Sequence, residues 1–308
     1  MLHRILFGLT FLILALACKS TSTPQNSSTP ESADSPGTWT QIASADSSKP
    51  IKRHEAAFVK VNDQLVLLGG RRIQPVSRFG LRAKTWTQGS KPPLEIHHFQ
   101  PVVYKDKVYI MGAFTGGYPD ESPVPLIYIY DPATDLWSTG DSIPADRLRG
   151  AAGVVFHKGS MYLVSGIQRG HMSGHVPWLD KYDPATGKWE KLADAPRSRD
   201  HFQAIVVENK LYLLGGRRSN APNAVFANAV AEVDVYDFAS GKWSTLPEPL
   251  PTLRAGNYVT KMKDEILVLG GESEFQPSAH NEVEALNVHS HQWRSLAPML
   301  RGRHGTGA

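Results

Sequence analysis

Tryptophan recurs along this chain at intervals of about fifty residues. The intervals between successive members of the series are 47, 51, 52, 54 and 50 residues. The series consists of Trp39, Trp86, Trp137, Trp189, Trp243 and Trp293. Short runs of alternating apolar residues, such as YIYDPATDLW and DKYDPATGKW, lead into these tryptophans. A repeated unit of this length and pattern predicts an all-β protein with one small sheet for each repeat.

A glycine pair, or a remnant of one, stands between successive tryptophans. Each ends an apolar strand such as QLVLLGG or KLYLLGG, and together they are Gly69-Gly70, Gly112-Ala113, Ser165-Gly166, Gly215-Gly216 and Gly270-Gly271. Glycine at a strand end permits close approach of another backbone, and tryptophan supplies a large apolar surface. We therefore assign both to packing. Small twisted sheets that cannot bury both faces alone stack around an axis as the blades of a propeller.

The repeat resembles the kelch family, whose hallmark is a glycine doublet, then a tyrosine, then a tryptophan within one four-stranded blade. Three repeats carry the tyrosine, at Tyr130, Tyr182 and Tyr236. The resemblance covers residues 39–308. It implies a kelch-type β-propeller with five full four-stranded blades and a partial sixth blade shared between the N- and C-termini.

The two ends of the domain predict how the ring closes. Trp39, in GTWTQI, has the character of a fourth strand, and RGRHGTGA has that of a first strand, because Arg303-His304 matches Arg53-His54. A complete sixth blade needs one full repeat. Once these two strands are subtracted from that repeat, roughly 30 residues are missing. We therefore expect a six-bladed architecture that is truncated. The alternative, a five-bladed ring with a two-stranded remnant, leaves exposed strand edges.

The first 37 residues predict export. Arg4 and an apolar run to Ala17 are typical of a signal peptide over residues 1–18. Cys18, the only cysteine, follows directly and resembles a bacterial lipobox, which implies lipidation and a place in the cell envelope, on the outer membrane or facing the periplasm. Plain secretion is the alternative. Residues 19–37 are rich in Ser, Thr and Pro and predict a disordered tether, so the propeller occupies residues 38–308.

In an antiparallel blade, the start of strand one and the end of strand two lie at the same end. Residues at these positions therefore gather at one mouth of the central channel, where the loops are also long. The candidate ligand-binding residues are Arg53, His54, Arg71, His97, His98, Arg149, Arg199, His201, Arg217, Arg254, Asn257, Arg303 and His304. For each arginine alone, pairing with loop carbonyls or acidic neighbours is the structural alternative.

Guanidinium groups separated by imidazoles suit an anion. Phe114, Tyr118 and Trp178 lie in the same loops and offer faces for a sugar ring. We therefore predict a binding module for an anionic carbohydrate-like ligand, a glycan or small anion. The net charge of +4 is too mild to argue for nucleic acid. We expect a monomer that meets the membrane only through its N-terminal lipid.

Catalysis and protein recognition are the alternatives. Kelch-type propellers include a copper radical oxidase, galactose oxidase, whose cofactor needs a cysteine linked to a tyrosine; with Cys18 in the signal region this chemistry is excluded, and we expect no cofactor. The family also includes a sialic-acid epimerase or mutarotase, for which Glu272 and Asp200 are the candidate acid–base residues. A scaffold for a protein partner is the third possibility, so enzymatic activity is left open.

One histidine pair has a spacing that metal sites use. In HMSGH, His171 and His175 stand four residues apart, which would suit two ligands on one face of a helix. Gly174 between them favours a loop. We therefore predict no metal site.

Overall fold

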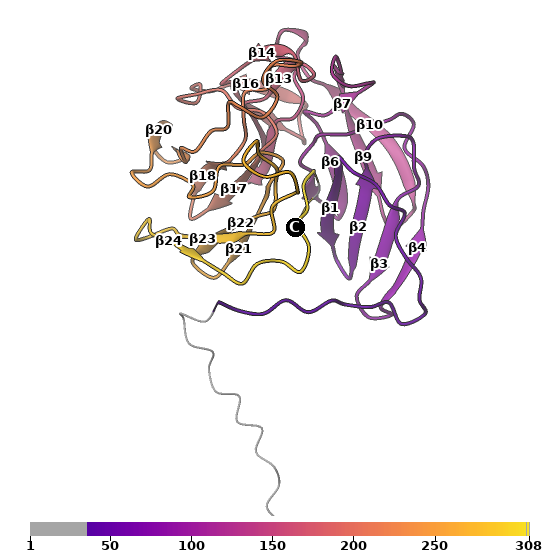
Figure 1. Cartoon of the computed structure of the whole chain (residues 1–308). Helices are drawn as coiled ribbons and strands as arrows, with labels where there is room; N and C mark the ends of the chain where they lie inside the picture. The colour runs from indigo at the N-terminus through magenta and orange to yellow at the C-terminus, as the bar shows by residue number, and fades with distance from the viewer. Residues whose placement is uncertain (1–35, 306, 308) are drawn as a thin grey trace, which may run out of the picture. The chain divides into compact units, whose positions relative to one another are not determined.

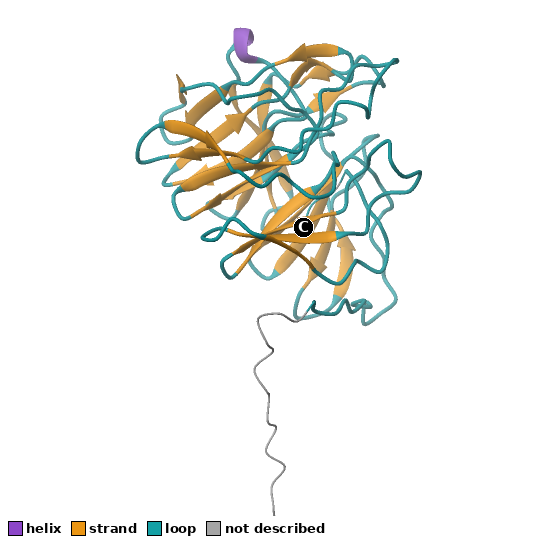
Figure 2. Ribbon diagram, turned by 60° about the vertical axis from the view of Figure 1, so that its left-hand side comes forward, coloured by secondary structure: helices purple, strands orange, loops and turns teal. Residues whose placement is uncertain are grey.

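The computed structural model describes residues 36–305 and 307, and this part of the chain is built almost wholly from β-strands (Figure 2). The one helical element within it is a 3-10 turn, η1, at Ala145–Arg147. No helix among the described residues combines the length and apolar character that a membrane crossing requires. The predicted signal peptide, Cys18 and the tether as far as residue 35 lie outside the described residues.

Five four-stranded antiparallel sheets form the blades, and they are arranged as a ring (Figure 1). Blade one contains β1 (Ala56–Val61), β2 (Gln64–Gly69), β3 (Ser77–Gly80) and β4 (Thr85–Gln88). Blade two contains β5 (Val102–Tyr104), β6 (Lys107–Ile110), β9 (Leu126–Asp131) and β10 (Leu136–Ser142). Blade three contains β11 (Gly153–His157), β12 (Ser160–Val164), β15 (Leu179–Asp183) and β16 (Lys188–Lys191).

The remaining blades follow the same plan. Blade four contains β17 (Gln203–Val207), β18 (Lys210–Leu214), β19 (Asp234–Asp237) and β20 (Lys242–Thr245). Blade five contains β21 (Tyr258–Met262), β22 (Glu265–Leu269), β23 (Val283–Asn287) and β24 (Trp293–Ser295). Two short hairpins lie in the long loops of blades two and three, namely β7 (Phe114–Thr115) with β8 (Ser122–Pro123) and β13 (Ile167–Arg169) with β14 (Ser173–His175).

The core lies between neighbouring blades. One apolar cluster joins Leu68 of blade one to Ile110 of blade two, and another joins Leu214 of blade four to Val268 of blade five. Within a blade, each predicted tyrosine and tryptophan are cross-strand partners; the ring centroids of Tyr182 and Trp189 are 4.8 Å apart. The kelch-type propeller expected from the sequence is confirmed.

A closed circle of backbone hydrogen bonds surrounds the channel and has six positions. Each position has a left-handed backbone with φ between 49° and 62°, and they are Glu55, His98, Ala151, His201, Gly256 and Gly305. Each amide bonds to the carbonyl of the position before it: His98 to Glu55 at 3.1 Å, Ala151 to His98 at 3.1 Å, His201 to Ala151 at 3.0 Å, Gly256 to His201 at 2.6 Å and Gly305 to Gly256 at 3.0 Å. The Ala56 amide closes the circle on the Gly305 carbonyl at 2.9 Å.

The C-terminal segment therefore holds the sixth place on the inside, near the centre of the ring in Figure 1. Trp39 holds the corresponding place on the outside. Its indole N–H donates to the Ala297 carbonyl at 2.7 Å, as Trp243 donates to Ala193 of the preceding blade at 2.8 Å. The two ends do share the sixth position, but neither forms the strand that the sequence predicted, because no strand is assigned in residues 36–50 or 300–305.

Candidate functional site

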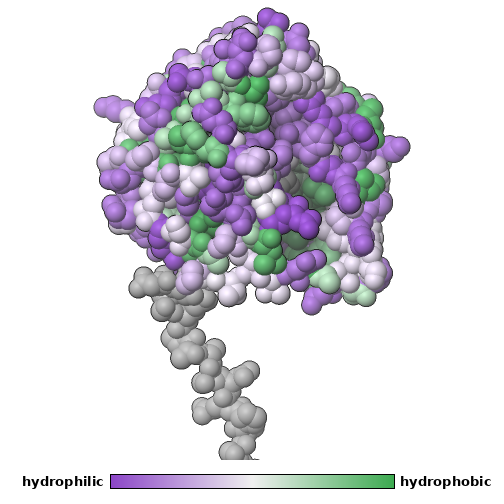
Figure 3. All heavy atoms as spheres, viewed as in Figure 1, coloured by the Kyte–Doolittle hydropathy of each residue, from purple (hydrophilic) through white to green (hydrophobic). Residues whose placement is uncertain are grey.

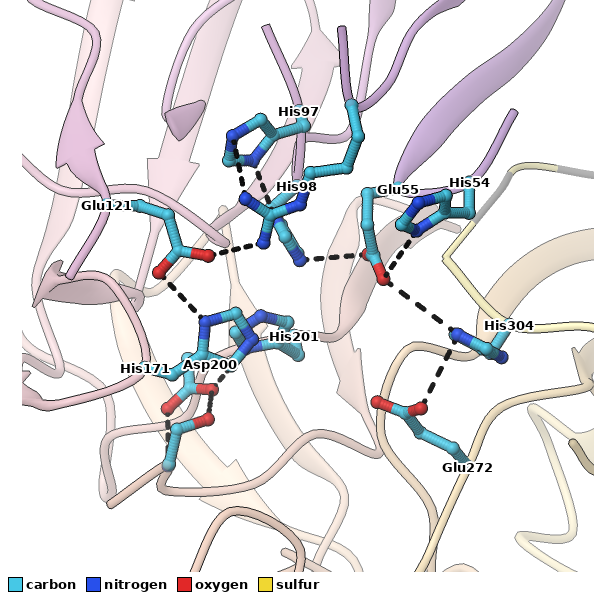
Figure 4. Close-up of polar contacts among 12 residues, drawn as sticks. His54, Glu55, His97, His98, Glu121, His171, Asp200, His201, Glu272 and His304 are labelled. Atoms are coloured by element: carbon cyan, nitrogen blue, oxygen red, sulfur yellow. Dashed lines mark hydrogen bonds and ion pairs between the residues drawn. The ribbon is translucent and has the colours of Figure 1, made fainter. Parts of the chain in front are cut away.

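The channel mouth is the end of the ring where first strands begin and second strands finish, as the pairing of Ala56 with Gly69 and of Gln203 with Leu214 shows. The hydrogen-bonded circle lies at this end. Hydrophilic residues border the hollow near the middle of the face shown in Figure 3. The side chains that converge there are drawn in Figure 4.

Three of the predicted arginines are inside the blades. Arg149, Arg199 and Arg254 are each 0% exposed. Arg149 donates to the carbonyls of Leu163 and Ser165 at 2.8 and 2.7 Å. Each also meets a carboxylate on the third strand of its own blade: Asp180 at 2.8 Å from Arg149, Asp234 at 2.7 Å from Arg199, and Glu284 beside Arg254. Burial lowers the pKa of Arg149 and of Arg199 to about 10, so both remain charged near neutral pH.

These three arginines therefore have a structural role, in which they pair with carbonyls and carboxylates inside their blades. They are not part of the mouth surface. Arg53 follows the same pattern in a half-buried place, where it donates to Gly69 and Pro75 carbonyls at 3.1 and 2.6 Å. Asn257 is buried and donates to the Leu214 carbonyl at 3.2 Å. Arg303, the fifth and last arginine of the strand-start series, is exposed.

The remaining predicted residues do lie at the mouth. His304 lies 3.9 Å from Glu55 and 3.5 Å from Glu272, which in turn is 2.7 Å from the buried Arg217. His54 is exposed and lies 3.8 Å from Glu55. Arg71 pairs with Glu121 at 2.5 Å. Carboxylates thus pair with histidine or arginine side chains around the opening.

Three imidazoles meet at the centre of the mouth (Figure 4). The ring centroids of His98, His171 and His201 are 4.4 to 5.1 Å apart, and all three side chains are buried. His98 and His201 belong to the circle, where their backbone carries them inward, and His171 comes from the turn between β13 and β14. The topology therefore brings together residues that are far apart in sequence.

A carboxylate stands behind each of the three imidazoles. Glu55 Oε2 is 2.9 Å from His98 Nε2, Glu121 Oε2 is 3.0 Å from His171 Nδ1, and Asp200 Oδ1 contacts His201 Nδ1. Asp200 also accepts from the Ser219 amide at 2.9 Å and lies 3.2 Å from His175, which ties it to two neighbouring loops.

These contacts decide which groups carry charge. Burial alone would raise the pKa of Glu121, but the bonds from His171 and Arg71 outweigh it and lower that pKa to about 2. Burial likewise opposes ionisation of Glu55 and Asp200, yet their histidine partners hold both pKa values well below the usual range. Burial, with Arg217 and His171 nearby, lowers the pKa of His201 well below its ordinary value. All three carboxylates are therefore ionised around a neutral His201.

Sequence reasoning missed several residues of the mouth. Glu121 is completely buried, and its only sequence signal is its place in the long loop after the second strand of blade two. Phe226 and Phe275, 40% and 68% exposed, line a hollow of about 450 Å³ together with Glu272 and His304. Of the aromatic residues predicted for stacking, Phe114 is buried, Trp178 packs against Arg147 at 4.1 Å, and only Tyr118 is well exposed.

The ring of blades and the loop-built mouth define a kelch-type β-propeller. Comparison with family models agrees: residues 31–251 match the model described as Attractin/LZTR1 beta-propeller, and residues 254–300 match the Kelch motif. The chain therefore belongs to the Attractin/LZTR1 β-propeller family of kelch proteins.

Several curated proteins are similar to the chain. Kelch-like protein terF of Aspergillus terreus is 29% identical over 329 aligned positions, which cover 100% of this chain and 68% of that protein. Beta-scruin of Limulus polyphemus is 25% identical over 227 positions, covering 71% of this chain and 24% of the relative. Human Kelch-like protein 23 is 22% identical and is covered to 43% of its length. The chain thus spans less than half of the latter two relatives.

Among solved structures, the one described as the structure of YjhT superimposes with a TM-score of 0.71 at 16% sequence identity. The match covers 84% of this chain and 88% of that one. At this identity the likeness shows the fold alone, and it supports the propeller architecture.

Proposed function

We propose that this propeller binds a small anionic, carbohydrate-like ligand at its channel mouth. The observation that carries the proposal is the distribution of charge. Four carboxylates at the mouth, Glu55, Glu121, Asp200 and Glu272, are each paired with a histidine or an arginine. Arg72, Arg218 and Arg303 are exposed on three different segments of this end and make no ion pair with any described residue. Unpaired guanidinium groups on a concave surface attract carboxylates and sulfates.

A hollow lined by Phe226, Phe275, Glu272, Glu274 and His304, the last of which directly follows Arg303 in the sequence, has the dimensions of a small-molecule site. Its volume of about 450 Å³ falls within the range typical of ligand pockets. Phe226 is supported from behind by the guanidinium of Arg217, 5.0 Å from its ring. A supported aromatic face suits the apolar side of a pyranose ring. The ligand would therefore place its ring on Phe226 or Phe275 and its acidic group toward Arg303, away from Glu272 and Glu274.

A panel of sugars tests the proposal. Thermal shift and calorimetry on the full chain would compare neutral, uronic, sialylated and sulfated sugars at two salt concentrations. We expect stabilisation by the acidic sugars only, weakened by salt because screening reduces exposed charge interactions. Equal responses to neutral sugars, or no response from folded protein, would reject the anionic ligand, and the latter would favour a protein partner.

A charge-matched pair of variants locates the binding. The triple variant R72A/R218A/R303A should lose most of the stabilisation that acidic sugars give to the unchanged protein. The control R82A/K188A/K242A removes three exposed cations from the opposite end of the blades, where third strands finish and fourth strands begin. The affinity of this control variant for acidic sugars should match that of the unchanged protein. Equal losses of affinity in both triple variants would indicate only a long-range charge effect.

We further propose that the protein is exported and lipid-anchored through Cys18, a proposal that rests on the sequence of residues 1–18 alone. Labelling of bacteria expressing the chain with radioactive palmitate should give a labelled protein, and the C18S variant should lose the label. Secretion of unlabelled protein by both forms would instead indicate cleavage without lipidation.

A further inference from the structure

We propose that His98, His171 and His201 form a binding site for a divalent transition-metal ion, with zinc as the best fit. One ring nitrogen from each of the three residues lies within 4.8 Å of the other two. All three side chains are buried at the centre of the mouth, and they come from blade two, the β13–β14 turn and blade four. The inference does not rest on the proposed sugar ligand.

The outer nitrogens of two of these histidines are engaged in the way that metal-bound histidines require. His171 Nδ1 donates to Glu121, and His201 Nδ1 donates to Asp200. A carboxylate behind the imidazole fixes the tautomer, so that the Nε2 lone pair is left to face a metal ion. This arrangement occurs twice within one cluster.

The inner nitrogen of His201 supplies an independent observation. Its Nε2 is buried and has no hydrogen-bond partner among the described residues. A buried acceptor left without a partner costs free energy, and such groups in folded proteins usually mark an ion, a water or a functional role. Since Asp200 occupies the other nitrogen, His201 Nε2 has a free lone pair.

A chain of hydrogen bonds orients His98 as well. His97 Nε2 lies 3.1 Å from the Gly116 carbonyl, which can only accept, so His97 Nδ1 is left as an acceptor. His98 Nδ1, 2.6 Å away, must then donate to it. The remaining nitrogen, His98 Nε2, lies 2.9 Å from Glu55 Oε2, and beside this ionised carboxylate it carries a proton. A metal ion would displace that proton to bind the Nε2 lone pair.

Three imidazoles form a donor set that suits zinc, with a water completing the tetrahedron. Zinc–nitrogen bonds of about 2.0–2.1 Å place tetrahedral ligand atoms about 3.3 Å apart, so nitrogens that lie within 4.8 Å of one another must move closer by up to about 1.5 Å. The negative charges of Glu55, Glu121 and Asp200 balance a divalent cation. The nearby cations Arg71 and Arg217 are each held by a carboxylate, Glu121 and Glu272 respectively, which limits their repulsion of the ion.

A small space adjoins two of the three histidines. This cavity of about 40 Å³ is lined by Glu55, His98 and His201 among others but not by His171, so it lies beside the proposed ion site and can hold a water. The three histidines do not line the hollow at Phe226 and Phe275, so metal and sugar would occupy separate parts of the mouth.

Direct titration tests the site. The full chain, stripped with a chelator, would be titrated with Zn²⁺ by calorimetry and with Co²⁺ by visible absorption, which is intense for a four-coordinate ion. We expect one ion per chain. H171Q and H201Q should each weaken binding by at least 100-fold, while E121Q and D200N should weaken it about 10- to 100-fold through the imidazoles they orient.

The chain offers a matched control. His289 lies in an exposed cluster with Glu208 and Asp264 on the opposite end of the blades, so H289Q should leave the affinity unchanged. Circular dichroism and melting would confirm that each variant is folded. E121Q and D200N keep all three histidines, so they still test the site if a histidine variant does not fold.

Some results would overturn the proposal. One is the absence of stoichiometric binding by folded protein, which would mean that water satisfies His201 Nε2. Another is binding that survives H171Q and H201Q, and a third is binding lost in H289Q, because the ion would then sit elsewhere.

Discussion

Arginine at the start of a blade's first strand satisfies carbonyl groups that the glycine pair leaves without partners. Arg199 shows the pattern, with its guanidinium bonded to the Gly215 and Glu232 carbonyls at 2.9 Å each and to Asp234. A lysine cannot reproduce this fork of donors. The repeated arginine is thus a structural device of the blade, and the same residue type becomes available for a ligand only where it is exposed.

We expect Arg199→Ala to lower the free energy of unfolding by about 3–5 kcal/mol, because it leaves a buried carboxylate and several carbonyls short of a partner. Urea unfolding followed by tryptophan fluorescence measures the change. Arg218→Ala, an exposed neighbour, should stay within about 0.5 kcal/mol of the unchanged protein. Similar stabilities for the two variants would contradict the structural role of Arg199.

The sequence could locate these residues but could not assign their burial. Arg149, Arg199 and Arg254 occupy the predicted places at strand starts. Their carboxylate partners lie about 30 residues further along, on third strands whose register a single sequence does not reveal. The histidine cluster was hidden for the same reason, because His171 approaches His98 and His201 only through the β13–β14 hairpin, which was expected as a loop.

At the level of the element, the third-strand tyrosines of blades two and three connect neighbouring blades through their hydroxyls. Tyr182 of blade three donates to Asp141 of blade two at 2.5 Å. Tyr130 donates at 2.7 Å to Asp135, which also accepts from the Ser90 amide that follows blade one. The hydroxyl of the kelch tyrosine therefore adds a polar link to the apolar contact between blades.

Burial and these carboxylates raise the pKa of Tyr130 and Tyr182, and burial raises that of Tyr258 to about 12. A folded pKa above the unfolded value of about 10 means that the stabilising effect is complete below pH 10 and is lost as pH rises through the folded value. In an alkaline titration followed by phenolate absorbance, these tyrosines should ionise only with unfolding. Y130F and Y182F should each remove part of that late step, and an unchanged curve would contradict the assignment.

The second glycine of the pair is required by its backbone. Gly216 has φ of 94°, and an added Cβ would lie 2.8 Å from the Asp200 carbonyl oxygen. We expect Gly216→Ala to cost about 1–3 kcal/mol of stability, measured by thermal melting. Gly117→Ala is the control, since a Cβ there meets nothing within 4 Å. Equal melting temperatures for the two variants would argue against strain at the glycine pair.

For the whole molecule, the repeat period was sufficient to predict the five blades, because each blade is a local unit of some fifty residues. Closure of the ring was also predictable from Arg303-His304, which matches Arg53-His54. The hollow lined by Phe226 and Phe275 was not, since loops of this length have no periodic pattern that fixes their path. The propeller scaffold can therefore be predicted from this sequence, whereas the shape of the mouth cannot.

Removing residues 303–308 should open the ring. The change deletes the bonds of the Gly271 amide to Arg303, of the Gly305 amide to Gly256 and of the Ala56 amide to Gly305. At about 0.5–1.5 kcal/mol for each hydrogen bond, we expect a loss of roughly 2–4 kcal/mol in denaturant unfolding. A shortened protein as stable as the full chain would show that the sixth position contributes nothing to closure.

The circle at the mouth also sets an order of events during synthesis. Ala56 belongs to the first blade to leave the ribosome. Its amide can bond to the Gly305 carbonyl only after the next 249 residues have been synthesised. Blades form early because their contacts are local, whereas this last bond joins segments near the two ends of the domain and is slow to form. Until it forms, the inner edge of blade one is open to other strands. A chaperone that acts on this protein should therefore be needed before the final residues emerge and become dispensable once they have docked.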